Sequence, residues 1–491
     1  MDPSSADRTS GQAGSGAPSA SGTPSASGAP SASASASASA SGVLKERART
    51  AIREGRDRII RLADEVWRTP ELGFKEVRTA ETVARFLEDL GLHVKTGLAL
   101  TGVKAEAAGK VPFVPADATF SRPPQVAVLG ELDAVICPGH PAADPRTGAA
   151  HACGHHAQLA VMAGVALGLV GSGVLDELSG SVLFMGVPAE EYVEFEYRLG
   201  LRREGKVEFI GGKPELIRLG EFDNVDMALL VHSGGFPGSR LSVGGTSNGF
   251  IGKSIRYVGR EAHAGGAPWL GANALNSAML AIAAINALRE TWKDEDSIRV
   301  HPIITRGGDL VNIVPADVRL ETYVRGRTMQ AIQDAAVKVD RALEAGAHAI
   351  GTRVEIEDLP GFLPMLSDAA LARLYGRNLA AVVGRDQMAE TGHMGGSTDM
   401  GDLSHIMPAL HPYGAGVTGH PHGTDFEVVD PDRAYIAPAE AVALTVIDLL
   451  AGGAREADAI RRESTPLLTR AAYVELVRSL FKRTVYPEVR G

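Results

Sequence analysis

Side chains that bind metals are concentrated in one short stretch of the chain. The six residues His151-Ala152-Cys153-Gly154-His155-His156 contain one thiol and three imidazoles, whereas the 491-residue chain has two cysteines and 14 histidines in total. Thiolates and imidazoles are ligands of Zn²⁺ and similar transition metals. Cys153 and His155 are two residues apart, so both can reach one ion from a loop, and a thiolate can also bridge two ions. The stretch therefore predicts a metal site.

A pair of glutamates supplies the carboxylates that such a site needs. Glu190-Glu191 follows Pro188-Ala189 and the apolar run 181–187. A metal lowers the pKa of water and polarises a carbonyl, and a nearby carboxylate can carry a proton from the water to a leaving amine. Successive side chains diverge, so we expect one glutamate to bind metal and the other to transfer the proton. A solvated surface pair is the alternative, but the position after an apolar strand and Pro-Ala favours a functional role. With a metal-bound water, such a pair could hydrolyse an amide bond.

Three short apolar runs, 125–130, 181–187 and 227–231, predict buried strands that alternate with helices. The first is followed by Glu131-Leu132-Asp133, the second by the glutamate pair and the third by His232. In open α/β sheets, ligands bind at the carboxyl ends of the strands. We therefore expect an α/β fold in which these polar groups meet at one edge of the sheet. For His232 alone, a structural histidine at a strand end is an equally good interpretation.

The chain is too long for one hydrophobic core, so we expect more than one domain. From about residue 244 to 358 the pattern becomes strand, helix, strand, strand, helix, which predicts a small α+β insert. The first 42 residues are almost all Ser, Ala, Gly, Pro and Thr and cannot bury enough surface to offset the entropy of ordering. The predicted parts are a disordered tail (1–42), a main domain in two pieces (43–243 and 359–453), the insert (244–358) and a helical C-terminal extension (454–491).

Composition limits the partners of the protein. The net charge of −10 argues against binding to nucleic acid or to an anionic membrane. Two cysteines in a chain of this length are expected to be thiols. The N-terminus lacks the apolar region of a signal peptide, and the longest apolar run, 159–170, is about half of the ~20 residues that cross a membrane. We expect a cytoplasmic protein.

The motifs together resemble the aminoacylase and carboxypeptidase-G superfamily of dinuclear metallo-amidohydrolases, of the peptidase M20 type. The branch that they resemble includes aminobenzoyl-glutamate hydrolase, auxin-conjugate hydrolases and β-alanyl-lysine dipeptidase-like proteins. The resemblance extends from about Leu44 to Leu450 and implies a zinc-peptidase-like mixed sheet flanked by helices, with an inserted α+β lid and dimerisation domain. The motifs that carry it are at residues 70–74, 130–134, 151–155, 188–191, 262–264, 312–315 and 396–401.

The resemblance also implies roles for single residues. It implies two divalent ions, Zn or Mn, with Co also tolerated, and Glu190 as the general base. Asp133 would contact a ligand imidazole and fix its orientation. The last ligand precedes an aromatic residue by four positions in relatives, which selects His422 before Phe426, with His420 as the alternative. The implied metal ligands are Cys153, His155, Glu191, His232 and His422.

Three residues of the insert have implied roles as well. His263 would reach the site of a neighbouring subunit and stabilise the oxyanion, which implies a homodimer formed through the lid. Asn312 and Arg325 would bind the carboxylate of the substrate, an N-acyl amino acid or a small dipeptide. The residues around His263, taken alone, are as compatible with a structural role as with a catalytic one. The bulky segment 192–212 departs from relatives, which implies a different choice of substrate.

Two other classes of function remain compatible with the sequence. One is a catalytically silent metal-binding paralogue whose insert serves assembly. The other is a hydrolase in which Cys153 is the nucleophile, which would survive metal chelation. Our main prediction is a metal-dependent amidohydrolase.

Overall fold

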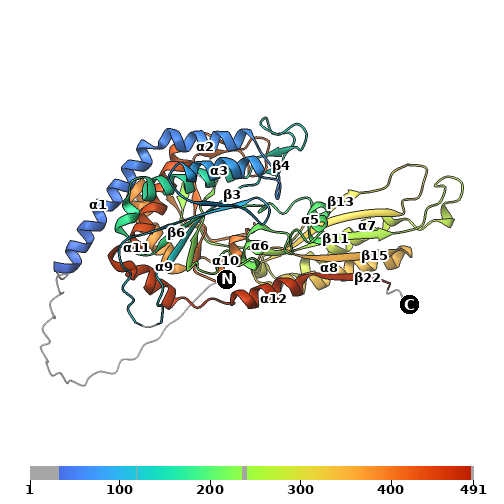
Figure 1. The fold of residues 1–491 in the computed structure, drawn as a ribbon. Coiled ribbons are helices and arrows are strands. Elements are labelled where there is room, and N and C mark those ends of the chain that lie inside the picture. The colour runs from blue at the N-terminus through green and yellow to red at the C-terminus, as the bar shows by residue number, and fades with distance from the viewer. Residues whose placement is uncertain (1–31, 118, 235–239, 488–491) are drawn as a thin grey trace, which may run out of the picture. The chain divides into compact units, whose positions relative to one another are not determined.

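The computed structural model describes residues 32–117, 119–234 and 240–487 (Figure 1). Most of the tail predicted for residues 1–42 therefore lies outside the described residues. Helix α1 (Ala32–Glu54) begins within the last part of that tail, before the point where the sequence predicts the first structure. The chain from Ser41 onward forms one compact unit.

A mixed six-stranded sheet forms the centre of the main domain. Its order is β1 (Val94–Leu98), β2 (Gly102–Ala108), β6 (Ser181–Val187), β3 (Gln125–Glu131), β7 (Met227–Leu229) and β18 (Ala409–Leu410). The four strands from β6 to β18 are parallel, whereas β1 and β2 are antiparallel to their neighbours. This arrangement confirms the predicted α/β fold with a mixed sheet.

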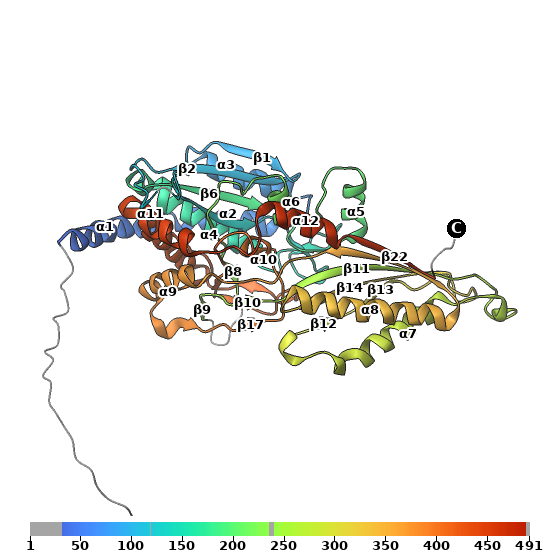
Figure 2. The same cartoon turned by 90° about the horizontal axis from the view of Figure 1, so that it is seen from below.

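Helices cover both faces of this sheet (Figures 1 and 2). Alternate residues of β3 face two different cores, because side chains alternate along a strand: Val126 and Val128 belong to one and Ala127 and Leu129 to the other. The first core is formed with α2 (Arg56–Arg68), α3 (Val77–Glu88), α4 (His155–Ala166), α9 (Ala369–Val383) and α11 (Ala437–Glu463). The second is formed with α6 (Gly212–Arg218), α10 (Met400–Ser404) and α12 (Arg470–Leu480).

The insert forms a second sheet with two helices, as predicted for an α+β lid. Its strand order is β12 (Arg299–Val300), β14 (Asp317–Gly326), β11 (Gly249–Val258), β15 (Arg353–Pro360) and β22 (Lys482–Tyr486), and β13 (Ile303–Arg306) also pairs with β14. Helices α7 (Ala274–Ala287) and α8 (Met329–Ile350) pack on one face over Val318, Leu320 and Val324 of β14. The alternate residues, among them Tyr323 and Arg325, lie on the other face.

The C-terminal extension differs from the prediction. Helix α12 fits the predicted helical extension, but the prediction is wrong for Lys482–Tyr486, which form β22 antiparallel to β15 of the lid. The physical reason is that Thr484, Val485 and Tyr486 favour strands, and β15 would otherwise present an unpaired edge. The extension therefore joins the lid to α12, which packs on the main domain.

Short elements shape the loops around the cavity between main domain and lid. Helix α5 (Phe195–Arg203) lies in the bulky segment that follows the glutamate pair. The short strands are β4 (Val135–Ile136), β5 (Ala149–Ala150), β8 (His232–Ser233), β9 (Leu241–Ser242), β10 (Thr246–Ser247), β16 (Met388–Ala389), β17 (His393–Met394), β19 (Tyr413–Gly414), β20 (Val417–Thr418) and β21 (Glu427–Val428).

One helical segment, Asp432–Glu463, is long and apolar enough to cross a membrane by length and composition alone. It is longer than the apolar run at residues 159–170. However, 83% of its most apolar window is buried inside the protein, as in a core helix. The predicted cytoplasmic location stays a prediction.

Helix α4 is buried along its whole length, including two adjacent histidines. The ring of His156 lies among His151 and Tyr435, with ring centres 5.6 and 6.4 Å away. Burial, with the nearby His155 and His140, lowers the pKa of His156 to about 3. Burial also lowers the pKa of His151 well below its usual value. Both imidazoles are therefore neutral in the folded protein at neutral pH.

We predict that His156 makes the protein sensitive to mild acid. Below the unfolded-state pKa of about 6.5 the unfolded chain binds a proton that folded His156 does not, so the stability falls by up to about 1.4 kcal/mol per pH unit for this group. His156→Asn should reduce the slope of unfolding free energy against pH between about pH 6.5 and 5. Urea unfolding of metal-free protein measures it. The exposed His93→Asn is the control, and equal slopes in His156→Asn and wild type would contradict the prediction.

Candidate active site

The predicted site residues come together at the carboxyl edge of the parallel strands. Asp133 follows β3, Glu190 and Glu191 follow β6, and His232 lies three positions after the end of β7. Cys153 lies just before α4, where Gly154 adopts a left-handed conformation (φ 87°) and a Cβ would come within 2.7 Å of Ser233 Oγ. Only glycine fits this turn, which brings the thiol against the strand ends.

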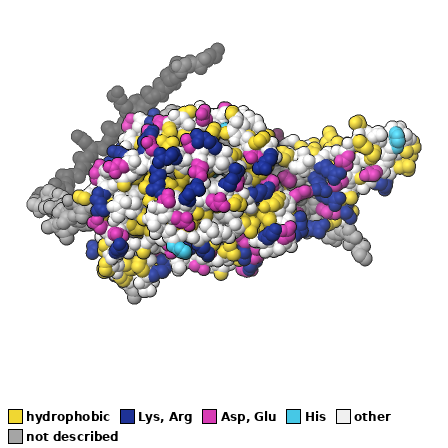
Figure 3. Space-filling view, turned by 45° about the horizontal axis from the view of Figure 1, so that its top comes forward, with side chains coloured by type: hydrophobic (Ala, Val, Ile, Leu, Met, Phe, Trp, Pro, Cys, Tyr) yellow, Lys and Arg dark blue, Asp and Glu magenta, His cyan; other side chains and the backbone are white. Residues whose placement is uncertain are grey.

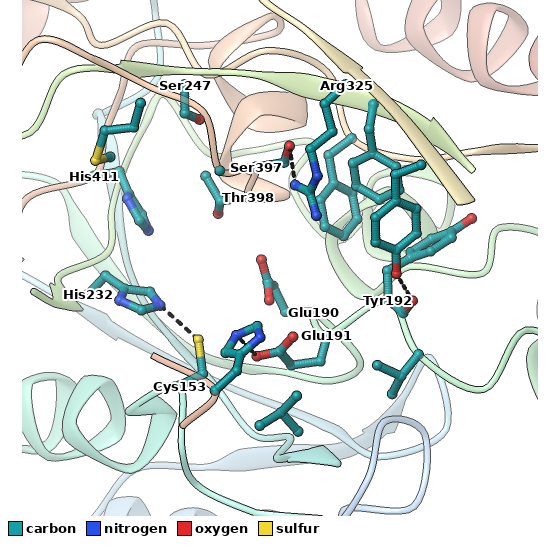
Figure 4. Close-up of a pocket in the computed structure, with 18 of the residues that line it drawn as sticks. Cys153, Glu190, Glu191, Tyr192, His232, Ser247, Arg325, Ser397, Thr398 and His411 are labelled. Carbon is teal, nitrogen blue, oxygen red and sulfur yellow. Dashed lines mark hydrogen bonds and ion pairs between the residues drawn. The ribbon is translucent and has the colours of Figure 1, made fainter. Parts of the chain in front are cut away.

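Of these residues, Cys153, Glu190, Glu191 and His232 line a cavity of about 480 Å³ between the main domain and the lid (Figure 4). The main domain contributes the thiol, the glutamates and three histidines, and strand β14 of the lid contributes Arg325. The polar lining residues that matter for the chemistry are Cys153, Glu190, Glu191, His232, Arg325, Ser397, Thr398, His411 and His422.

Two groups of potential ligands share the thiol of Cys153. One contains His155 and His232, the other contains Glu191 and His422, and within each group the ligand atoms lie within 4.8 Å of one another. Cys153 Sγ is 3.5 Å from His232 Nε2, and His422 Nε2 is 3.2 Å from Glu191 Oε1. The two clusters of potential ligands therefore lie side by side and have the sulfur of Cys153 in common.

The structure distinguishes the two candidate histidines near the C-terminal end of the main domain. His420 has a side chain that is 87% exposed, and its ring is paired with Asp425 rather than with the site. His422 lies beside Glu191, and its backbone N–H donates to Ala152 O at 2.8 Å. The geometry thus favours His422, the residue that the family pattern selects.

The potential ligand atoms are better satisfied by a bound cation than by hydrogen bonds among themselves. Among the described residues, His155 Nε2 and Glu191 Oε1 are buried atoms that make no hydrogen bond of good geometry, although Glu131 Oε2 and His422 Nε2 lie 3.1 and 3.2 Å away. Buried polar atoms are almost always well satisfied, so close donor atoms that do not hydrogen-bond fit a cation between them. Burial and Glu191 oppose ionisation of Cys153, yet His232 and His155 lower the pKa of its thiol to about 6. Thiolate, imidazole and carboxylate are a suitable set for divalent transition metals.

Asp133 holds two of these groups in position. His155 Nδ1 lies 2.9 Å from the Asp133 carbonyl oxygen and 3.2 Å from its carboxylate, which leaves Nε2 of the ring available to a metal. The other carboxylate oxygen of Asp133 accepts the backbone N–H of Glu191 at 2.8 Å. Asp133 therefore lies where the prediction places it, next to a ligand imidazole.

Glu190 is the carboxylate left outside the two groups around Cys153. It belongs to a third cluster with Glu131 and His155, and its Oε2 is 3.8 Å from His155 Nε2. The two oxygens of Glu131 already accept hydrogen bonds from Lys213 (2.6 Å) and Gln158 (2.8 Å), so Glu190 is the free member. Burial, and then the charges of Glu131 and Asp399, raise the pKa of Glu190 well above its usual value.

Arg325 is the predicted substrate-binding residue that the structure brings to the cavity. Its Nη1 donates to Ser397 Oγ at 2.7 Å, and its guanidinium lies 4.9 Å from the centre of the Tyr323 ring. Burial lowers the pKa of Arg325, but Tyr323, Glu190 and Glu191 oppose that shift. The group is aimed into the cavity opposite the glutamates (Figure 4).

The other two predicted residues of the lid lie elsewhere. His263 and Asn312 are exposed residues of neighbouring lid loops, joined by the bridge between His263 and Ile313, and they do not line the cavity of their own chain. The backbone N–H groups of Gly265 and Gly266 donate to His263 Nδ1 at 3.2 and 2.9 Å. The proton of the neutral ring is therefore on Nε2, which is free to donate.

Sequence reasoning missed several residues of the site. Glu131 is part of the motif at residues 130–134, but nothing in the sequence indicated that its partner would be Lys213. His411 and Tyr413 contact the ring of His232, with ring centres 5.5 and 5.8 Å away, and also line the cavity. The position of His411 after a strand in the same sheet could have indicated it.

Comparison with known proteins agrees with this geometry. The family model "Peptidase family M20/M25/M40" matches residues 127–447. The chain is 30% identical to the Xaa-Arg dipeptidase of Mus musculus, over 83% of this chain and 89% of that protein. It is also 30% identical to a p-aminobenzoyl-glutamate hydrolase chain of Escherichia coli, over 62% of this chain and 58% of that protein.

Solved structures show the same fold at lower sequence identity. A dinuclear metal-binding peptidase of the M20 family from Bacillus subtilis has a TM-score of 0.57 and 21% identity, covering 81% of this chain and 99% of that one. An aminobenzoyl-glutamate utilization protein from Klebsiella pneumoniae has a TM-score of 0.59 and 19% identity, covering 81% and 97%. With the family match over most of the main domain and lid, the chain belongs to peptidase family M20/M25/M40 and is a metal-dependent hydrolase of amide bonds.

Proposed function

We propose that the protein cleaves the amide bond of an N-acyl amino acid or small dipeptide with two divalent ions held by Cys153, His155, Glu191, His232 and His422. The observation that carries the proposal is that two ligand groups share one thiol beside a free carboxylate, Glu190. Zn²⁺ suits the thiolate and imidazoles best, and Mn²⁺ and Co²⁺ are the alternatives.

Glu190 is the proposed general base. A bound divalent ion supplies Lewis acidity, which lowers the pKa of water and polarises the scissile carbonyl. Glu190 takes the proton from the attacking water and delivers it to the leaving amine. Burial raises the pKa of this carboxylate, so it holds a proton more readily than an exposed glutamate does. This suits it both to take the proton from water and to carry it to the leaving amine.

The lid side of the cavity recognises the substrate. Among the described residues that line the cavity, Arg325 is the one Lys or Arg, so it is the natural partner of a substrate carboxylate. The names of two relatives, a dipeptidase and an aminobenzoyl-glutamate hydrolase, support a small substrate with a carboxylate near the amide. A cavity of about 480 Å³ has room for such a molecule.

A homodimer formed through the lid would complete the site. His263 and Asn312 lie outside their own cavity, and the Nε2–H of His263 can donate to an oxyanion in a partner's site. Hydrophobic side chains are visible along the lid in Figure 3, and the exposed fraction of Trp269 is 75%. Exposed apolar side chains of this kind favour an interface. The others in the lid are Leu270, Met279, Leu280, Ile303, Ile304, Leu310, Val311, Ile313 and Val337.

One observation favours a second candidate function. The pKa of Cys153 is lowered to about 6, and its sulfur lies 3.5 Å from His232 Nε2, which would also suit a cysteine nucleophile. The same features describe a bridging metal ligand, and Glu191 and His422 on the other side of the thiol have no role in a cysteine mechanism. A silent metal-binding paralogue would keep the ligands without turnover.

We predict that Glu190→Gln lowers kcat by about 10²–10⁴-fold while both metal ions stay bound, because the change removes proton transfer but no ligand. Metal content by elemental analysis and hydrolysis of a panel of dipeptides and N-acyl amino acids measure the two effects. Glu46→Gln, at an exposed position of α1, is the control. A wild-type chain that binds metal but hydrolyses no member of the panel would support the silent paralogue instead.

Metal removal separates the metal mechanism from the cysteine mechanism. We predict that chelation abolishes hydrolysis and that reloading with Zn²⁺, Mn²⁺ or Co²⁺ restores it, because the metal supplies the nucleophile. Bound metal should also protect Cys153 from a thiol alkylator. Activity that survives chelation, and is then lost on alkylation of the metal-loaded protein, would identify Cys153 as the nucleophile.

A mixture of two inactive variants tests the dimer. Glu190→Gln and His263→Ala each disable a site, but in a mixed dimer one site has both residues intact if His263 acts across the interface. Coexpression should restore about a quarter of wild-type activity, since half of the dimers are mixed and half of their sites are complete. Light scattering should give the mass of two chains. No recovery in a protein of dimer mass would place His263 outside the partner's site.

A further inference from the structure

A buried ion cluster lies next to the cavity and is separate from the two ligand groups that share Cys153. Lys213, at the start of α6, has a side chain with no exposed surface. Its Nζ donates to Glu131 Oε1 at 2.6 Å and also to Asp399 Oδ1. The backbone N–H of Lys213 donates to the other oxygen of Asp399 at 3.1 Å. One lysine is therefore bound to two buried carboxylates from distant parts of the chain.

The Glu131 end of this cluster contacts the metal side of the cavity. Glu131 Oε2 lies 3.1 Å from His155 Nε2 and accepts from Gln158 Nε2 at 2.8 Å. The backbone N–H of Glu131 donates back to Gln158 Oε1 at 2.9 Å. The carboxylate is thus held on both oxygens, beside a ring that we propose as a ligand.

The Asp399 end contacts the substrate side. Asp399 directly follows Ser397 and Thr398, which line the cavity, and Ser397 Oγ accepts from Arg325 Nη1 at 2.7 Å. Because Asp399 receives both the ammonium and the backbone N–H of Lys213, its turn is fixed relative to α6. The position of Ser397, and with it the orientation of Arg325, depends on that anchor.

A second buried lysine shows what such a cluster does when it is far from the site. Lys253 of β11 also has no exposed side-chain surface and binds two carboxylates, Asp340 (2.6 Å) and Asp358, within the lid. None of these three residues lines the cavity. Lys253 is therefore a suitable control, because its ion pairs stabilise the fold without contacting the cavity.

We propose that Lys213 is a positioning residue for the reaction. Through Glu131 and Asp399 it holds the metal-side wall and the substrate-side wall of the cavity in a fixed position relative to each other. The inference rests on the proposed function of the site. It assigns different effects to the two carboxylates: Glu131, whose Oε2 lies beside the metal-facing nitrogen of His155, acts on the metal position, and Asp399 acts on the substrate through Ser397 and Arg325. Lys213 acts on both.

Four variants test this division: Lys213→Met, Glu131→Gln, Asp399→Asn and Lys253→Met. Zn²⁺ affinity of the metal-free protein, KM and kcat after reloading, and the thermal midpoint are measured for each. Glu131→Gln should weaken Zn²⁺ binding by about 10-fold or more with KM nearly unchanged, because it removes a negative charge beside the metal position. Asp399→Asn should raise KM by a similar factor and leave Zn²⁺ affinity unchanged. Lys213→Met should show both effects, and Lys253→Met should lower only the thermal midpoint.

Several outcomes would overturn the proposal. One is a folded Lys213→Met protein with wild-type Zn²⁺ affinity and KM. Another is a Lys253→Met protein with the same losses, which would show that general destabilisation explains them. If Lys213→Met does not fold, the two carboxylate variants decide, and the proposal fails if they do not separate Zn²⁺ affinity from KM. A wild-type chain that binds no Zn²⁺ would overturn the proposed function itself, whereas these outcomes leave it intact.

Discussion

Desolvation of the ligand atoms is the constraint on which the rest of the site depends. Glu191, just after β6, and His155, at the start of α4, are buried, and among the described residues His155 Nε2 and Glu191 Oε1 make no hydrogen bond of good geometry. Burying such groups without a partner is costly. A cation between them removes the cost, and the shared thiol of Cys153 places two such positions side by side. The left-handed turn at Gly154 brings the sulfur of Cys153 to this edge from a loop, and the hydrogen bonds of Asp133 hold Glu191 and His155 there.

Several contacts tie the lid to the main domain, and two of them limit how the cavity can open. Tyr192, in the segment before α5, packs with Phe250 and Tyr323 of the lid sheet at ring-centre distances of 5.2 and 6.2 Å, and its hydroxyl donates to Pro360 O. Strand β22 adds a second connection at the β15 edge. Because Arg325 lies on the same strand as Tyr323, contacts that hold the lid also place the guanidinium over the glutamates. Substrate entry therefore requires either a small movement around this aromatic cluster or approach past the half-exposed His422.

The sequence predicted those features of the fold and site that depend on local residue patterns. Apolar runs that end in polar residues predicted β3, β6 and β7 and the edge where Asp133, Glu190 and His232 meet, because strand burial and the position of ligands in α/β sheets follow general rules. The choice of His422 over His420 needed a family pattern, since the two histidines are almost adjacent. The Lys213 cluster could not be predicted, because its partners are 82 and 186 residues away and no periodicity links them. The strand β22 was missed for the same reason, as its partner strand lies in another domain.

The difference between Glu190 and Glu191 shows how one dipeptide comes to supply two chemical roles. Ala189 has a positive φ of 54°, and the backbone N–H of Glu191 is bound to Asp133, so the two side chains leave the strand end in different directions. Burial opposes ionisation of both. For Glu191 burial is the largest single effect, but the charge and hydrogen bond of His422, with His155 and Cys153, together outweigh it and lower the pKa to about 2, whereas for Glu190 the charges of Glu131 and Asp399 add to burial. A bound cation would strengthen the first effect most, because Glu191 is the proposed ligand. Neighbouring carboxylates whose environments push their pKa values apart are the pattern expected of a metal ligand beside a proton carrier.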